Sequence, residues 1–160
     1  MSIKILPAYD FPEEIKLLFS EYTDILIEGD LSFKEYLEIQ NYDDELKHLE
    51  KKYGLPYGRL YLVYYNNEVA GCIGLKKIDK KNCEMKRLYV RPKFRGKQIG
   101  EQLIEKIIKA AKEIGYSYML LDTLPFLKGA IYLYKKYGFY EIASYNNSPM
   151  DTSIYMKLDL

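Results

Sequence analysis

Residues 84–100 place the strongest constraint on the fold of this chain. The run from Glu84 to Val90 is rich in strand-forming residues, Pro92 ends it, and an amphipathic helix follows. The turn between them carries two cations and two glycines, Arg95, Lys97, Gly96 and Gly100. Free backbone N–H groups at a helix start attract phosphate, and nearby cations strengthen that attraction. The sequence therefore predicts a strand, an anion-binding turn and a helix in this order.

The elements around this turn predict a mixed sheet. Three β-rich runs separated by short polar turns, residues 60–65, 68–78 and 83–90, indicate an antiparallel meander. After the turn, helix and strand alternate before two closing strands. The pattern predicts a helix over 97–114, a short apolar strand over 118–122 and a helix over 127–137. A hairpin meander followed by strand-helix-strand-helix predicts an α/β (α+β) fold with helices on both faces of the sheet.

The N-terminal third is predicted to be mainly helical. A first strand over residues 3–8 precedes a helix that opens at Asp10 or Pro12 and ends near Gly29. Ser32 followed three residues later by Glu35 has the pattern of a capping box, and helix continues to Lys52 in one or two pieces.

Composition narrows the class of protein. The chain has 160 residues, which suits one domain spanning residues 1–160. The net charge of +1 argues against a broad nucleic-acid surface, and no apolar run reaches the ~20 residues of a membrane span. The two cysteines, Cys72 and Cys83, have no metal-like or disulfide-like spacing, so we expect buried thiols, no metal site and a cytoplasmic location.

The anion-binding turn does not match the two common nucleotide motifs. A P-loop requires Lys and Ser or Thr after its last glycine, but Glu101 and Gln102 follow Gly100 here. A Rossmann fingerprint has a different glycine spacing and follows the first strand. Judged alone, the turn fits a solvated loop as well as a phosphate site.

Two motifs together resemble the GNAT family of N-acetyltransferases. The family's pyrophosphate motif, Arg/Gln-x-x-Gly-x-Gly/Ala, matches at Arg95 and Gly100, with Gln98 in place of the middle glycine. A later family helix, Asn-x-x-Ala-x-x-Leu/Phe-Tyr-x-x-x-Gly-Phe, matches over residues 127–139, with Leu127 in place of the asparagine. The resemblance is strongest over residues 84–139 and is closest to an uncharacterised bacterial subgroup.

This resemblance implies a GNAT fold, with a mostly antiparallel sheet of six to seven strands and a parallel pair that splays apart. It also implies that the chain binds acetyl-CoA and transfers the acetyl group directly to a primary amine in a ternary complex. The residues implied in cofactor binding are the backbone of Leu88 and Val90, the turn residues Arg95, Gly96, Lys97, Gln98, Ile99 and Gly100, and Tyr134.

Two residues are the candidates for catalysis. Tyr134 matches the family tyrosine that protonates the departing thiolate, although a tyrosine packed in the core explains the position equally simply. Glu84 lies eleven residues before Arg95, where some family members place a general base, and strand alternation predicts that it shares a face with Leu88 and Val90. A surface carboxylate paired with Lys86 or Arg87 is the competing interpretation.

Several properties stay open at this level. The acceptor is a small-molecule or peptide amine, expected between the region of residues 22–36 and the loop 145–152. The family often forms homodimers, and the sequence leaves the oligomeric state undecided. The alternative function is a GNAT fold that binds CoA without catalysis and serves as a sensor or interaction module. His48, in a charged helical stretch, is expected at the surface.

Overall fold

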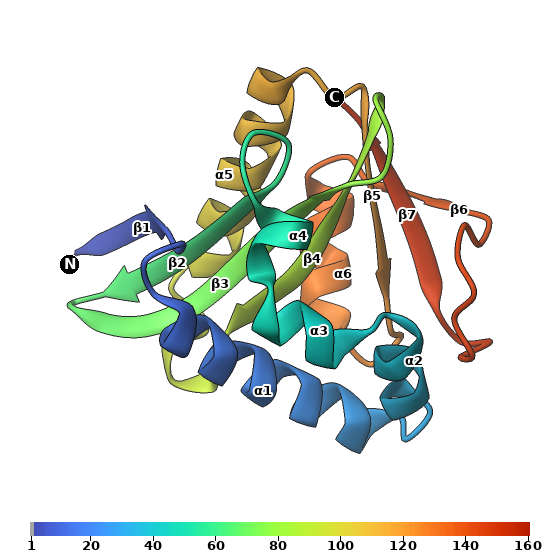
Figure 1. Cartoon of the computed structure of the whole chain (residues 1–160), viewed down its shortest axis with the longest axis horizontal. Helices are drawn as coiled ribbons and strands as arrows, with labels where there is room; N and C mark the ends of the chain where they lie inside the picture. The colour runs from blue at the N-terminus through green and yellow to red at the C-terminus, as the bar shows by residue number, and fades with distance from the viewer. Residues whose placement is uncertain (1) are drawn as a thin grey trace.

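The computed structural model describes residues 2–160 and contains one seven-stranded sheet between two layers of helices (Figure 1). The strands lie in the order β1-β2-β3-β4-β5-β7-β6. Their bounds are β1 Ile3–Pro7, β2 Arg59–Tyr65, β3 Glu68–Lys77, β4 Asn82–Val90, β5 Tyr118–Thr123, β6 Tyr140–Ile142 and β7 Ile154–Asp159. Every neighbouring pair is antiparallel except β4 and β5, which are parallel. The predicted mixed, mostly antiparallel sheet is confirmed.

Helices cover both faces of this sheet, as predicted. They are α1 Pro12–Gly29, α2 Phe33–Ile39, α3 Tyr42–Lys47, α4 Leu49–Tyr53, the 3₁₀ turn η1 Pro92–Phe94, α5 Ile99–Ile114 and α6 Lys128–Lys136. In Figure 1, α1 to α4 lie in front of the sheet, whereas α5 and α6 lie behind it. We refer to the two sides as the α1–α4 face and the α5–α6 face.

Each face has its own buried core. The core on the α5–α6 face includes Leu103 and Ile107 of α5, packed on alternate residues of β2 to β5. The core on the α1–α4 face joins Leu18 and Phe19 of α1 to Leu60 and Leu62 of β2 and to Cys72 of β3. Successive side chains of a strand point to opposite faces, so Leu62 and Val63 belong to different cores.

The local turn predictions were partly right. Asn66 and Asn67 form the tight turn between β2 and β3, with φ of 48° and 69°, in the left-handed region that asparagine tolerates. The predicted capping box is wrong, because Ser32 has helical dihedral angles and makes no side-chain capping bond to α2. The helical stretch that follows is divided into three helices rather than one or two.

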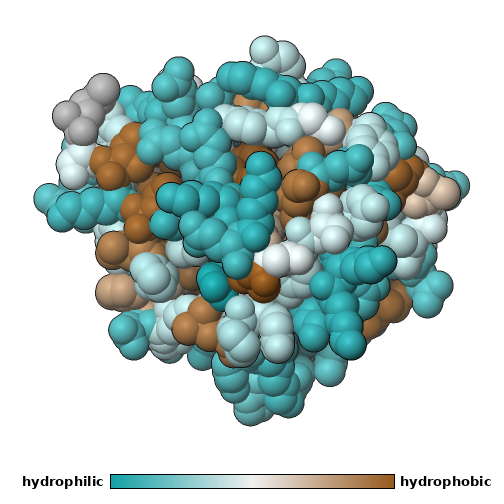
Figure 2. All heavy atoms as spheres, turned by 90° about the horizontal axis from the view of Figure 1, so that it is seen from above, coloured by the Kyte–Doolittle hydropathy of each residue, from teal (hydrophilic) through white to brown (hydrophobic). Residues whose placement is uncertain are grey.

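The surface seen in Figure 2 mixes hydrophilic residues with smaller hydrophobic patches. The most exposed large apolar side chains are Leu31, Tyr132 and Leu55, at 79%, 68% and 65%, and they come from well-separated parts of the sequence. Within residues 2–160, no helix is long and apolar enough to cross a membrane. The oligomeric state stays open, and a homodimer of the kind the family often forms stays a prediction.

Candidate active site

The parallel strands β4 and β5 separate in the middle of the sheet. Their pairing covers only Asn82 to Glu84 against Tyr118 to Leu120. Beyond Glu84, the edge of β4 that faces β5 has no strand partner in the described part of the chain. Backbone groups on such an edge need hydrogen-bond partners, so an extended ligand can pair with them.

A β-bulge at Arg87 shapes this edge. Arg87 has a φ of 60°, and the register against β3 shifts between Cys72 and Gly74. An extra residue in one strand reverses the alternation of side chains beyond it. Arg87 therefore points toward the α1–α4 face, as Lys86 does, and its side chain reaches Glu45 of α3.

The bulge overturns one prediction made from strand alternation. Glu84 was expected to share a face with Leu88 and Val90. Leu88 and Val90 pack against the core of the α5–α6 face, whereas Glu84 contacts Lys86, which reaches Gln40 on the α1–α4 face. The prediction was wrong because alternation holds only up to the bulge at Arg87.

The anion-binding turn is built from two left-handed residues. Gly96 has a φ of 77° and Gln98 a φ of 62°. Gln98 was expected to be helical, which is wrong, because it precedes the helix and Ile99 is the first residue of α5. The first hydrogen bond of α5 joins the Gln102 N–H to the Gln98 carbonyl at 3.2 Å, which leaves the N–H groups of residues 99–101 outside the helical ladder.

A groove of about 640 Å³ runs from this turn to α6. Arg95, Gly96, Gln98, Ile99 and Gly100 line it at one end, and Leu88, Val90 and Tyr134 line it further along. The Arg95 Nε donates to the Val90 carbonyl at 3.2 Å. Among the residues expected to bind the cofactor, Lys97 does not line the groove and lies over the Tyr65 ring, 5.3 Å from its centroid.

Ile99 and Gly100 contribute backbone rather than side chains to the groove. The Ile99 side chain is 1% exposed and packs in the core, so only its backbone can meet a ligand. A Cβ added to Gly100 would lie 3.4 Å from Leu133 Cδ1 and 3.9 Å from Val90 Cγ2, which is ordinary contact. Packing within the protein therefore does not require glycine here, which fits a position kept open for a ligand at the helix N-terminus.

Tyr134 lies where this groove meets a second, smaller cavity. It projects from α6, is 7% exposed and lines both spaces. Burial raises the pKa of its hydroxyl far above the ordinary value, and the nearby Tyr22 and Asp122 raise it further. The hydroxyl therefore keeps its proton at neutral pH and is available as a proton donor.

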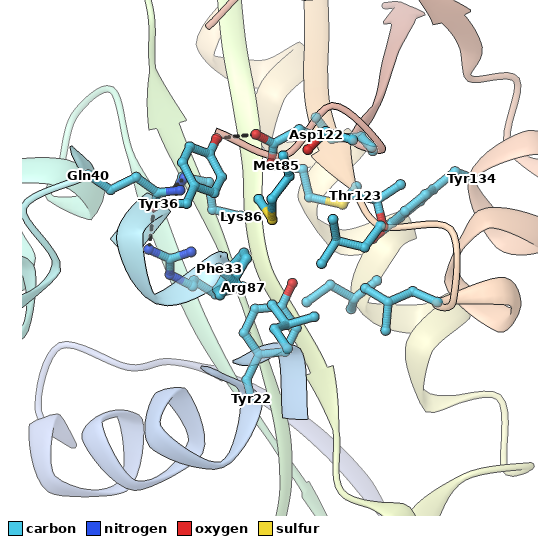
Figure 3. A pocket seen from close by; sticks show the side chains of 17 residues that line it. Tyr22, Phe33, Tyr36, Gln40, Met85, Lys86, Arg87, Asp122, Thr123 and Tyr134 are labelled. Atoms are coloured by element: carbon cyan, nitrogen blue, oxygen red, sulfur yellow. Dashed lines mark hydrogen bonds between the residues drawn. The ribbon is translucent and has the colours of Figure 1, made fainter. Parts of the chain in front are cut away.

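The second cavity, of about 30 Å³, lies on the far side of Tyr134 (Figure 3). In this view, Tyr36, Gln40 and Arg87 lie on one side and Asp122, Thr123 and Tyr134 on the other. Met150, from the loop between β6 and β7, also lines it. The cavity thus joins the two segments expected to build the acceptor pocket. We call it the acceptor-side cavity.

Glu84 lies beside this cavity but does not line it. The Tyr145 hydroxyl donates to its Oε2 at 2.6 Å, and the Lys86 Nζ lies 3.7 Å from its Oε1. The side chains of Glu84 and Lys86 are 8% and 7% exposed. The competing interpretation of Glu84 is therefore correct in naming Lys86 as its partner. It is wrong in placing Glu84 at the surface, because the side chain is buried.

A buried ion cluster anchors the bulge. Arg87 donates from Nε and Nη2 to the two carboxylate oxygens of Glu45, each at 3.0 Å, and from Nη2 to the Gln40 side chain at 2.8 Å. Lys52 and the Tyr53 hydroxyl also donate to Glu45, at 2.7 and 3.0 Å. Burial alone would raise the pKa of Glu45, but Arg87 and then Lys52 outweigh it and lower this pKa to about 2. No sequence pattern pointed to this cluster, because Arg87 lies 42 residues from Glu45 in the chain.

Asp122 is a further candidate residue to which no sequence motif points. It lies at the end of β5 and lines the acceptor-side cavity. The Tyr36 hydroxyl and the Asn146 Nδ2 both donate to its Oδ2, the latter at 2.8 Å. A lone acidic residue near the end of an otherwise apolar strand was the available signal.

The remaining candidates are placed as expected. Cys72 and Cys83 are buried and unpaired, and burial raises the pKa of the Cys83 thiol to about 12. His48 is at the surface near Asp44 and Glu50. Across residues 2–160, no group of three or more metal-ligating side chains is arranged to hold an ion.

The fold and the groove define a GNAT-type acyltransferase. A model of the acetyltransferase (GNAT) family matches residues 19–139, and the chain therefore belongs to this family. An uncharacterised N-acetyltransferase of Schizosaccharomyces pombe is 37% identical over 150 residues, which cover 92% of this chain and 88% of that protein. The predicted family and enzyme class, N-acetyltransferase, are confirmed, and such relatives are not confined to bacteria.

Solved structures share the fold. The PaiA N-acetyltransferase of Thermoplasma acidophilum, solved in complex with coenzyme A, has a TM-score of 0.74 and 21% identity over the whole of both chains. A GNAT acetyltransferase from Elizabethkingia anophelis, solved with acetyl-CoA bound, is 32% identical with a TM-score of 0.57. That match covers 65% of this chain and 77% of the other.

Proposed function

We propose that this protein transfers an acetyl group from acetyl-CoA to a primary amine by direct attack within a ternary complex. The observation that carries the proposal is the meeting of two spaces at Tyr134. The groove from the anion-binding turn ends there, and the acceptor-side cavity begins there. Both reactants can therefore be present together, with the reacting atoms between them.

The turn residues suit the phosphate end of CoA. Helix α5 presents unpaired N–H groups at its start, Arg95 adds a positive charge, and Gly100 leaves room beside them. The related Elizabethkingia enzyme was solved with acetyl-CoA bound, which supports the same co-substrate here. The unpaired edge of β4 at Leu88 and Val90 would hold the pantetheine arm through backbone hydrogen bonds.

The transfer forms a C–N bond, breaks the thioester C–S bond and moves two protons. A backbone N–H on β4 near Leu88 would donate to the carbonyl oxygen as negative charge develops on it. Tyr134, which keeps its proton at neutral pH, would donate that proton to the departing thiolate. Glu84 and Asp122 are the carboxylates on the acceptor side that can accept the proton of the amine.

A steady-state assay that follows CoA release tests this proposal over a panel of amines. Direct transfer predicts intersecting double-reciprocal plots, and no acetylated protein after incubation with acetyl-CoA alone. Parallel plots with an acetylated protein would refute direct transfer. Tight CoA binding without transfer to any amine would instead favour a non-catalytic CoA-binding module.

A further inference from the structure

Asp122 lies on β5 just beyond the point where β4 and β5 stop pairing. Strand pairing ends at Glu84 opposite Leu120, and Asp122 lies two residues further along β5. It lines the acceptor-side cavity together with Tyr134 and Leu88, which also line the groove. In Figure 3 Asp122 and Tyr134 lie on the same side of the cavity. A molecule in this cavity can thus touch Asp122 while it faces the end of the groove.

Two distant segments hold the Asp122 carboxylate in place. Tyr36 of α2 donates to Oδ2, and Asn146 of the loop between β6 and β7 donates to the same oxygen at 2.8 Å. Asn146 is itself fixed by the Tyr155 hydroxyl, which donates to its Oδ1 at 3.0 Å. Both donors approach one oxygen, and within residues 2–160 Oδ1 accepts no hydrogen bond. The carboxylate is therefore oriented and retains acceptor capacity.

Asp122 also differs from the other acidic residues near the cavity in its charge balance. Glu45 is neutralised by Arg87 and Lys52, and Glu84 lies beside Lys86. Asp122 has only neutral donors and forms no ion pair with any described residue. Lys86 and Arg87 line the same cavity, and the charge of Lys86 acts on Asp122. However, Lys86 lies beside Glu84, and Arg87 is paired with Glu45. A carboxylate with no cation in contact favours a positively charged ligand.

We propose that Asp122 binds the ammonium group of the acceptor and accepts its proton, so that the substrate is a cationic aliphatic amine. This inference rests on the proposed acetyl transfer and assigns a residue and a substrate class to it. Before attack, one N–H bond of the ammonium breaks and its proton passes to the Asp122 carboxylate. The freed lone pair then attacks the thioester carbon, and the C–S bond breaks so that its electron pair leaves with sulfur. Tyr134 donates its proton to this thiolate and is reprotonated by the second proton that the attacking nitrogen loses, so the balance is one amide, one CoA thiol and the proton held by Asp122.

Glu84 is less suited to this role. Its Oε2 accepts the Tyr145 hydroxyl, its Oε1 faces Lys86, and it does not line the cavity. An incoming ammonium would have to displace both partners to reach it. Asp122 needs no such displacement, because one of its oxygens is free of hydrogen bonds from the described residues.

Two pairs of isosteric amines test the proposal. Ethylamine and n-hexylamine are cationic near neutral pH, whereas methoxyamine and O-pentylhydroxylamine have nearly the same shape but are neutral. The CoA-release assay gives kcat/KM for each probe with the wild type, Asp122→Asn, Glu84→Gln and Asp159→Asn. Asp159 is the matched control, because it also accepts a tyrosine hydroxyl, that of Tyr140 at 2.7 Å, but on another part of the sheet.

We expect Asp122→Asn to lower kcat/KM for the cationic amines by ~10²-fold or more, and for their neutral counterparts by less than ~10-fold. The control should leave all values near those of the wild type, and CoA binding should be unchanged in both variants. If Asp122→Asn lowered kcat/KM equally for the cationic and the neutral amines, Asp122 would have only a structural role, and the inference would be overturned. A charge-selective loss in Glu84→Gln instead would assign the role to Glu84. A wild type inactive on all four probes would overturn the proposed transfer itself.

Discussion

Replacing Glu45 by glutamine should test the buried cluster that holds the β4 bulge. The Glu45 side chain is fully buried, at 0% exposure, and the Arg87 side chain is 4% exposed. Glutamine keeps the size of the side chain and one acceptor oxygen but removes the negative charge. Arg87 would then be buried without a counterion, in a backbone conformation with a φ of 60° that few residues other than glycine adopt readily.

The size of the effect follows from the pKa of Glu45. A folded-state pKa of about 2, against an ordinary value of 4.5, corresponds to ~3 kcal/mol of stability at neutral pH. Loss of one partner of a buried ion pair costs ~3–5 kcal/mol in other proteins. Both routes predict that Glu45→Gln lowers the free energy of unfolding by ~3 kcal/mol.

The pH dependence has a definite sign. Because the folded-state pKa is depressed, the stabilisation is fully present above pH 4.5 and is lost as the pH falls toward about 2. The difference between wild type and Glu45→Gln should therefore be constant from pH 7 to pH 5. It should narrow by ~1 kcal/mol by about pH 3.5.

Urea unfolding followed by circular dichroism measures both effects. Glu68→Gln is the matched control, because Glu68 pairs with Lys93 at 2.9 Å while their side chains are 55% and 72% exposed. We expect that control to change stability by less than ~0.5 kcal/mol. A loss below ~1 kcal/mol in Glu45→Gln, or a difference that does not depend on pH, would refute the reasoning.

Three further predictions concern the groove. Tyr134→Phe should lower kcat by ~10²-fold or more with unchanged CoA affinity, because the hydroxyl acts only on the departing thiolate; an unchanged kcat in the CoA-release assay would remove it from the mechanism. Gln98→Gly should raise the free energy of unfolding by ~0.5 kcal/mol. Glycine removes the backbone strain of ~1–2 kcal/mol that a side chain causes at a φ of 62°, and this gain exceeds the ~0.4–1 kcal/mol lost because glycine makes the unfolded chain more flexible. The control Gln102→Gly lies within α5 and should lower the free energy of unfolding by ~1 kcal/mol. Denaturation curves of the two glycine variants that shifted in the same direction would contradict this prediction. Arg95→Ala should weaken CoA binding by ~10-fold or more in calorimetry, most strongly at low salt, whereas equal weakening in Lys93→Ala would indicate a general charge effect.

Local patterns were sufficient for most of the elements. The meander, α5 and α6 were predictable because apolar periodicity and turn residues act over a few positions, as at Asn66 and Asn67. The capping box at Ser32 shows the limit of such patterns, because the residue types were right but the backbone before α2 is already helical.

The two acidic residues on the acceptor side show what strand alternation and motifs could not predict. Glu84 was singled out by its spacing from Arg95, but the bulge at Arg87 places it away from the groove-lining side chains. Asp122 had no motif to identify it. The orientation of its carboxylate depends on Tyr36 and Asn146, which lie 86 and 24 residues away in the chain.

The sequence by itself determined the family, the order of strands and helices, and the turn before α5, because these depend on residues close together in the chain. Only the tertiary structure decided which side chains line the cavity beside Tyr134. A single extra residue in β4, stabilised by Glu45 of α3, reverses the alternation beyond Arg87. The ion pair that holds this bulge joins residues 42 positions apart, and no local pattern encodes such a contact.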